Sequence, residues 1–318
     1  MIVRGGKDAA SDPGRVTTRR RLNPVRQGTP PDAAPDEYAE LVREAATGDA
    51  AAMERLLMIE LSAAGCAVEA QLNGMPVAAL GPGGGSTSLA VHEYTLAGKN
   101  QLVIVVAPAP AGASVASQPR IAIGPTWARA RLVLVRRGQS PADAETRVLG
   151  LVEWGAVEGR SYDAPSTHSR DVDLPVSFPR WRWLDAPVLT MSPAVQRQVL
   201  EFVQQLAVEL GRGNPDPLLA AAKLRFDELA LAYQSDPAEA VQRFRNQLQR
   251  LYAAKALKII PPVAADLVLR PVAASRLIDC LALTGGPALH TLNDAAGLGE
   301  HAWPLRLAMV EGRIYVLR

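Results

Sequence analysis

Residues 67–77 read Ala-Val-Glu-Ala-Gln-Leu-Asn-Gly-Met-Pro-Val, and this stretch decides the fold of the first half of the chain. Val68, Ala70 and Leu72 alternate with polar residues, which is the two-residue period of a strand with one buried face. The pair Asn73-Gly74 then separates this run from a second apolar run. Both central residues of a type I′ turn need a positive φ angle, so the pattern predicts a β-hairpin.

More strands are expected on either side of this hairpin. Residues 102–106 form an almost continuous apolar run, which favours a buried central strand. The glycine-rich residues 81–87 are expected to form a flexible or hairpin loop. Several short strands with Pro and Gly between them predict a β-sandwich. The remaining expected strands cover 89–94, 130–135 and 148–157.

The apolar period changes from two to 3.6 residues near residue 190. Ser192-Pro193, Asp216-Pro217 and Asp236-Pro237 each place a capping residue before a proline, as helix starts commonly do. Three amphipathic helices are therefore predicted from residue 192 onward, and Pro261-Pro262 is expected to end this helical region. Alternating residues on both sides of Glu311-Gly312 predict a β-hairpin over 304–317.

These patterns together predict an α+β protein of several modules. An antiparallel, jelly-roll-like β-sandwich is expected over 58–185, and a helix-rich α+β domain with a small antiparallel sheet, ending in a β-hairpin, over 190–318. Residues 1–35 are expected to be a disordered tail, because Gly and Pro are frequent there and large apolar residues are scarce. Residues 36–57 are expected to form a short helical segment, since their apolar residues recur at helical spacing.

Charge and composition exclude some classes of partner. The 34 basic and 32 acidic residues give a net charge of +2, which argues against a nucleic-acid partner. No run approaches the roughly 20 apolar residues of a membrane span, and residues 1–7 make a poor secretory signal, so we expect a cytoplasmic protein without a membrane partner. Cys66 and Cys280 are expected to be buried, reduced thiols. No cofactor is predicted.

Two short sets of residues resemble known families. Leu72-Asn73-Gly74, Glu93-Tyr94 and residues 98–105 (Gly-Lys-Asn-Gln-Leu-Val-Ile-Val) are similar to the galactose-binding-like jelly roll, a sandwich that often accompanies glycoside hydrolases. This resemblance covers residues 58–185 and implies a fold more than a ligand. The glycine-rich 81–87 segment departs from the family, and no calcium site can be placed. The hairpin over 303–317 gives the second half a likeness to the nuclear-transport-factor-like cone fold.

Catalytic and metal-binding signatures are missing from the sequence. The glycine-rich segment lacks the lysine of a Walker loop, and no G-x-S-x-G elbow is present. His168, Asp171 and Asp173 form the one cluster that mixes a histidine with two carboxylates, and we expect it in a solvated loop. Its spacing matches no strong metal signature. No residue is therefore assigned a catalytic, cofactor-binding or metal-binding role.

Aromatic residues supply the first candidate binding site. Trp181 and Trp183 share one face of an extended segment, with Arg182 between them and Trp154 elsewhere in the sandwich. Exposed indoles would offer a platform to a sugar ring or a protein partner, whereas buried ones would be core. An alternative pocket in the second half would bring together His290, Asp294 and His301 for acid–base chemistry. The other interpretation of these three is a set of polar surface loops.

The sequence thus leaves three functions open. We rank first a non-catalytic binding or interaction protein that recognises a protein partner. The second is a carbohydrate-binding protein that uses an aromatic face of the sandwich, which requires Trp181 and Trp183 to be exposed. The third is an enzyme with its pocket in the second half.

Overall fold

The computed structural model describes residues 55–108, 117–136, 138–139, 146–174, 178–292 and 300–318. All of them belong to one compact unit, residues 33–318. The predicted tail over 1–35 and most of the predicted helical segment lie outside the described residues. Residues 55–57 are described, and they belong to a strand, so the helix prediction is wrong there. From Leu56 to Glu60 the side chains of this strand alternate between half-buried and buried, as a strand with one covered face requires.

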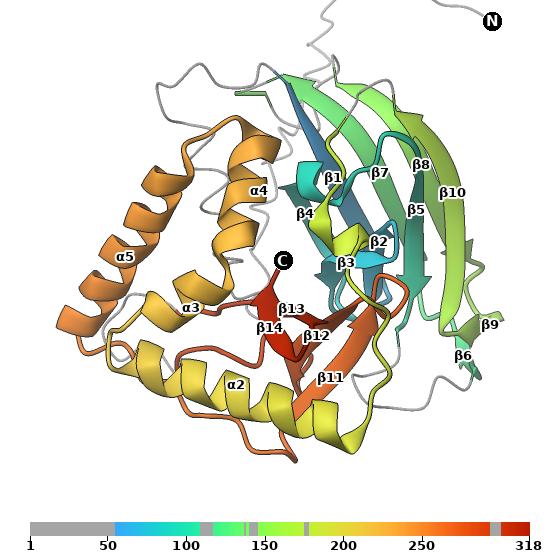
Figure 1. Ribbon diagram of the computed structural model, residues 1–318. Coiled ribbons are helices and arrows are strands. Elements are labelled where there is room, and N and C mark those ends of the chain that lie inside the picture. The colour runs from blue at the N-terminus through green and yellow to red at the C-terminus, as the bar shows by residue number, and fades with distance from the viewer. Residues whose placement is uncertain (1–54, 109–116, 137, 140–145, 175–177, 293–299) are drawn as a thin grey trace, which may run out of the picture. The chain divides into compact units, whose positions relative to one another are not determined.

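The first half contains two four-stranded antiparallel sheets (Figure 1). The first has the order β4 (Gly85–Ala90), β1 (Arg55–Ala64), β7 (Thr126–Arg136), β8 (Arg147–Ala156). The second has the order β10 (Ser166–Leu174), β5 (Gly98–Val106), β2 (Val68–Leu72), β3 (Met75–Leu80). Apolar residues from both sheets form one buried cluster, so the sheets pack face to face. The predicted hairpin is confirmed: Leu72 pairs with Met75, and Asn73 and Gly74 have φ angles of 55° and 76°.

Two segments of this half differ from expectation. Of the two forms expected for the glycine-rich segment, the hairpin is wrong, because the segment joins β3 of one sheet to β4 of the other. Gly84 is needed there, since a Cβ atom would lie 2.3 Å from the carbonyl oxygen of Ala63. The strand expected over 89–94 ends at Ala90, and the 3-10 helix η1 (His92–Tyr94) follows.

A small two-stranded ribbon completes the described strands of this half. Strand β6 (Gln118–Ile121) pairs with β9 (Ser161–Ala164) in antiparallel fashion. Beyond it, Ala122 N–H donates to Arg160 O, and Gly159 N–H donates to Ala122 O. Gly159 has a φ angle of 74°, so this is a bulge with glycine in the left-handed region. The bulge bends the ribbon where it meets β7 and β8.

The predicted helices of the second half are present, with one modification. They are α2 (Pro193–Gly211), α3 (Asp216–Ala221), α4 (Lys223–Tyr233) and α5 (Pro237–Ala253). Ser192 Oγ accepts from Val195 N–H at 3.2 Å, and Asp236 Oδ1 accepts from Ala238 N–H at 2.8 Å, which confirms two caps. The second predicted helix is divided at Ala222, and Asp216 does not cap it.

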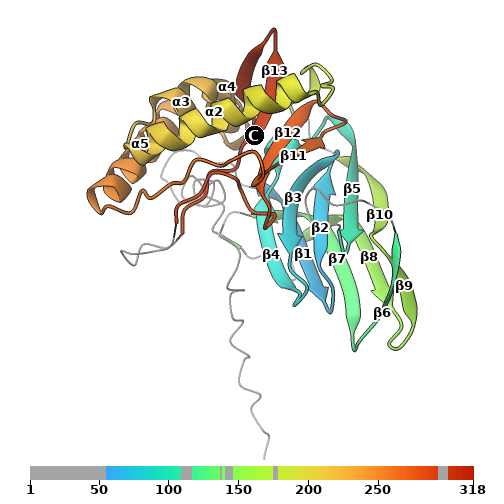
Figure 2. The same cartoon turned by 90° about the horizontal axis from the view of Figure 1, so that it is seen from below.

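Four antiparallel strands follow the helices in sequential order. They are β11 (Leu267–Val272), β12 (Leu277–Ala282), β13 (Arg306–Val310) and β14 (Arg313–Val316). The last two form the predicted hairpin. Helix residues such as Val203 and Leu206 share a buried cluster with sheet residues such as Ile278 and Leu307, and Figure 2 shows α2 lying along this sheet. Separate antiparallel sheets and a group of helices make this an α+β protein.

A third buried cluster joins the two halves. We call it the junction cluster, and it contains residues of the sandwich, of the connecting segment with the 3-10 helix η2 (Arg182–Leu184), of α4 and of the second sheet. Residues of the sandwich are thus buried in the same cluster as residues of α4 and of the second sheet. Its buried members are Met75, Ala90, Trp181, Trp183, Ala186, Ala232, Tyr233, Val272, Ala273, Leu277, Ala308 and Leu317.

Candidate functional site

Trp181 and Trp183 lie inside the junction cluster, so they form no exposed platform. Their exposed fractions are 0% and 3%. Trp181 Nε1 donates to Thr95 O at 2.6 Å, and the guanidinium of Arg318 stacks 5.6 Å from the ring centroid. The hypothesis that these indoles bind a sugar or a partner is wrong. A tryptophan that donates its N–H to a buried carbonyl belongs to the core.

The other two residues of that candidate site lie apart from each other. Arg182 is exposed, and its backbone N–H donates to Glu228 Oε1 at 2.6 Å. Trp154 is half-buried between the sheets, where its ring meets that of Tyr162 edge-on at 5.0 Å and lies 6.2 Å from the ring of His168. Trp154 therefore fills the space between the two sheets near β9.

Buried charges cross the junction cluster. Arg318 Nη1 lies 2.6 Å from Glu228 Oε2, and only 1% of the Arg318 side chain is exposed. Its Nη2 donates to Glu93 O at 3.0 Å, and the Tyr233 hydroxyl donates to the Glu93 carboxylate. Burial, followed by the charge of Glu93, raises the pKa of Tyr233 well above its ordinary value. These contacts tie η1 of the sandwich to α4.

His92 connects the same elements as a neutral side chain. Its Nε2 accepts the Leu57 N–H at 2.7 Å, so the proton must be on Nδ1, which donates to Ala232 O at 2.9 Å. The ring stacks on Tyr233 with centroids 4.9 Å apart. Burial lowers the pKa of His92 to about 4, against a smaller raising effect of the Ala232 hydrogen bond. A protonated ring would carry a hydrogen on Nε2, so that two N–H donors, those of His92 and Leu57, would face each other.

A second polar network lies beside the first. Arg270 of β11 bridges Glu69 of the sandwich at 2.6 Å and Asp279 at 2.9 Å. Arg306 contacts Asp279 at 3.2 Å and donates to the hydroxyl of Tyr94 at 3.1 Å. Both networks use their polar groups to hold the two halves together, so the junction is a structural feature.

The alternative pocket in the second half does not assemble from its predicted residues. His290 pairs with Ala302 in an antiparallel bridge, and Thr291 N–H donates to His301 O. Neighbouring positions on a strand point to opposite faces, so His290 and His301 lie on opposite sides of this short ribbon. His290 Nδ1 lies 3.0 Å from Pro287 O. Asp294 lies outside the described residues.

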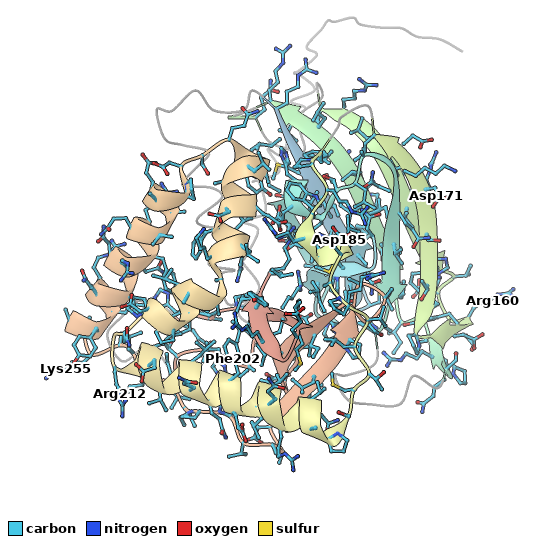
Figure 3. The ribbon with its side chains drawn as sticks, in the orientation of Figure 1. Arg160, Asp171, Asp185, Phe202, Arg212 and Lys255 are labelled. Carbon is cyan, nitrogen blue, oxygen red and sulfur yellow. The ribbon has the colours of Figure 1, made fainter. Side chains whose placement is uncertain are left out.

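The remaining reactive side chains form no centre in the described part of the chain. His168, Asp171 and Asp173 belong to strand β10 and not to a loop, and Asp171 projects to the outside of it (Figure 3). No group of three His, Cys, Asp or Glu side chains there is arranged to hold a metal ion. Cys66 and Cys280 are buried, and burial raises the pKa of both thiols. They are therefore poor nucleophiles.

Exposed apolar residues gather where β6 and β9 meet β7 and β8, a feature that the sequence analysis missed. Ala122, Thr126 and Ala128 are buried, whereas Ile123, Pro125 and Trp127 between them are exposed. We call the exposed apolar set the outer stripe. Its members and exposed fractions are Ile121 (66%), Ile123 (88%), Trp127 (37%) and Val157 (67%), with exposed Pro125 among them.

The alternation of the sequence could have revealed the outer stripe. Ala128, Ala130 and Leu132 form the core face of β7, so the intervening positions must face solvent. Counting back by twos from Trp127 gives Pro125, Ile123 and Ile121. A solvated face normally carries polar residues, whereas Trp127 and the exposed residues that lead into β7 before it are apolar.

Polar residues continue the outer face of the first sheet beyond Trp127. Arg129 lies 5.9 Å from the Trp127 ring centroid, and its Nη1 is 3.8 Å from Glu153 Oε1. Arg131 and Glu60 form a hydrogen-bonded ion pair on the next row. Gly155 pairs with Trp127 and has no side chain to cover the indole. The arrangement is an apolar stripe with a charged margin.

Comparison with known proteins adds no relative. No family model, no curated protein and no solved structure matches the chain. Within the described residues, no helix has the length and apolar character needed to cross a membrane.

Proposed function

We propose that the chain is a non-catalytic binding protein that holds a protein partner on the outer stripe. One observation carries this proposal: Ile121, Ile123 and Val157 are each more than half exposed although they are large and apolar. Single exposed apolar residues are common, but a contiguous set marks an interaction surface. Trp127 and Arg129 add two of the three residue types that are enriched at interface hot spots.

The rest of the fold supplies a rigid support for this surface. All connections between the eight strands of the sandwich cross from one sheet to the other, except β2–β3 and β7–β8. We infer from this crossing pattern that the sandwich is a jelly roll, as the resemblance implied. The cone-fold likeness of the second half stays a prediction. Trp127 belongs to β7, Ile121 ends β6, and Val157 directly follows β8, so the stripe is held by the ends of paired strands.

Comparative capture from host cells tests the proposal. The bait proteins are the wild type, the double variant Ile123→Ser/Val157→Ser, and Leu283→Ser, which removes an apolar side chain that is also more than half exposed (58%) but lies outside the stripe. We expect at least one protein to be retained by the wild type and the control and depleted about tenfold by the double variant, because interface energy concentrates in few residues. Equal retention by all three baits would refute a docking role for the stripe.

Carbohydrate binding is a second candidate, now based on Trp127. Its indole is exposed, Gly155 leaves one side open, and Arg129 and Glu153 offer hydrogen bonds beside it. An apolar ring next to polar groups suits a sugar. A glycan array separates the candidates: sugar binding must be lost in Trp127→Ala and kept in Ile123→Ser/Val157→Ser. The enzyme alternative is not proposed, because His290 and His301 face opposite ways.

A further inference from the structure

We propose that the partner contributes an extended segment that adds to β6 as a new edge strand, with apolar residues alternating with acidic ones. This inference rests on the proposed function, because it specifies what the outer stripe binds. Adding a strand to an open sheet edge is a common mode of peptide recognition: backbone hydrogen bonds give affinity, and alternate side chains give specificity.

The hydrogen bonds of Ala122 show which backbone groups face outward. Both its N–H and its C=O bond to the β9 side, at Arg160 and Gly159. Backbone groups of successive strand residues point to opposite sides, so those of Ile121, the last residue of β6, point away from β9. We infer that Ile123, two residues further along, presents its backbone groups on the same side. No other described strand pairs with β6. Unpaired groups of this kind are a template for a further strand.

The two ends of this edge limit the added segment to a short one. Pro119 has no N–H to donate, which ends the run of donors before Ile121. At the other end, Gly65 packs so closely that a Cβ atom there would lie 2.7 Å from Pro125 O. The chain after β1 therefore occupies the edge next to Pro125. The open part is centred on Ile121 and Ile123.

Side chains on the two faces of the edge define the chemistry of the partner segment. Ile121 and Ile123 would lie beside alternate residues of the added strand, which should be apolar. Arg120 lies on the opposite face of β6, and Arg160 is on the segment that bonds to Ala122. Both arginines are exposed, and neither belongs to an ion pair within the described residues. The intervening residues of the partner should therefore be acidic.

A second copy of this chain fits the edge less well. Two β6 strands paired antiparallel around Ile121 would place Pro119 opposite Ile123 twice. Each such pair would lack one backbone donor. The same pairing would bring the Arg120 side chains of both copies to diagonal positions, where like charges repel. A foreign strand avoids both losses.

Peptide selection with a backbone readout tests strand addition. The probe is a phage-displayed library of random twelve-residue peptides, selected on the full chain. We expect enrichment of peptides whose apolar and acidic residues alternate. Hydrogen exchange followed by NMR should then show protection of the Ile121 and Ile123 amides by a selected peptide. N-methylation of alternate peptide residues should abolish binding although the side chains remain.

Charge reversal supplies the matched control. Arg120→Glu should weaken the selected peptide about tenfold at low salt, because like charges across an interface are strongly unfavourable. Arg313→Glu, at an exposed arginine of β14, should leave affinity unchanged. Failure to enrich any alternating peptide overturns strand addition, as does binding that leaves both amides unprotected. Dimerisation of the free chain in light scattering, with protection of the Ile121 and Ile123 amides in the dimer, would also contradict it, because a second copy would then occupy the edge.

The outcomes separate this inference from the proposed function. Capture of a protein can require Ile123 and Val157 while the amide hydrogens of Ile121 and Ile123 still exchange with solvent in the complex. In that case the stripe binds a folded surface, and strand addition is wrong. If stripe variants capture everything that the wild type captures, the proposed function itself is wrong.

Discussion

The junction cluster and the outer stripe both depart from the usual placement of side chains, because the junction buries charged groups and the stripe exposes apolar ones. At the junction, the charged side chain of Arg318 is 1% exposed and has a carboxylate partner, whereas at the stripe the apolar Ile123 is 88% exposed. A buried charge is tolerated where partners within the fold satisfy it. An exposed apolar row gains nothing within the fold. The junction therefore serves stability, and the stripe is the better candidate for function.

The largest predicted effect follows from breaking the junction ion pair. Arg318→Met leaves the Glu228 carboxylate buried without its 2.6 Å partner and should lower the free energy of unfolding by about 3–5 kcal/mol. Urea denaturation measures this change. The double variant Arg318→Met/Glu228→Gln should recover much of the loss, because no buried charge is then left unpaired. Arg212→Met, at an exposed pair, should cost less than about 1 kcal/mol.

The next largest effect is a pH dependence through His92. Its pKa is about 4 in the fold against 6.5 ordinarily, so between these values the unfolded chain binds a proton that the folded chain does not. Stability should therefore fall as the pH drops from 6.5 to 4, by about 3 kcal/mol over the window.

Denaturation at a series of pH values checks this dependence. His92→Gln should be less stable at pH 7 and should lose the slope between pH 6.5 and 4. His168→Gln, at a half-exposed histidine of β10, should keep it. An unchanged slope in His92→Gln would contradict the neutral hydrogen-bonded ring.

Matched tryptophan substitutions give a smaller contrast. Trp181→Phe removes the hydrogen bond to Thr95 O and leaves that carbonyl buried, which should cost about 1–3 kcal/mol. Trp127→Phe should change stability by no more than about 0.5 kcal/mol, because the indole is partly exposed and not part of the buried clusters. Thermal unfolding of both variants distinguishes the cases, and equal losses would contradict the contrast.

Local signals made much of the fold predictable from sequence. Asn73-Gly74 specified its hairpin through φ angles, and Ser192 and Asp236 specified helix starts through capping. The junction was not predictable, because Glu93 meets Tyr233 across 140 positions of sequence. Trp181 and Trp183 illustrate the same limit: alternation placed them on a common face, but only tertiary packing decides whether that face is covered. The outer stripe needed the knowledge of which face of β7 is buried.

The smallest predicted effect on stability belongs to the stripe itself. In Ile123→Ser/Val157→Ser, each substitution should change the free energy of unfolding by no more than about 0.5 kcal/mol, because both side chains are already in solvent. A strand position does prefer β-branched residues, but the effect is modest at exposed sites. Urea denaturation checks this, and a loss comparable to that of Arg318→Met would show that the stripe supports the fold.

Partner capture by Ile123→Ser/Val157→Ser, compared with Leu283→Ser at matched stability, tests the central claim most directly. A partner that the wild type and Leu283→Ser retain and the double variant loses would establish the stripe as the binding surface of a stable scaffold. Undiminished capture by the double variant would contradict it and would leave the exposed apolar row without a function in partner binding.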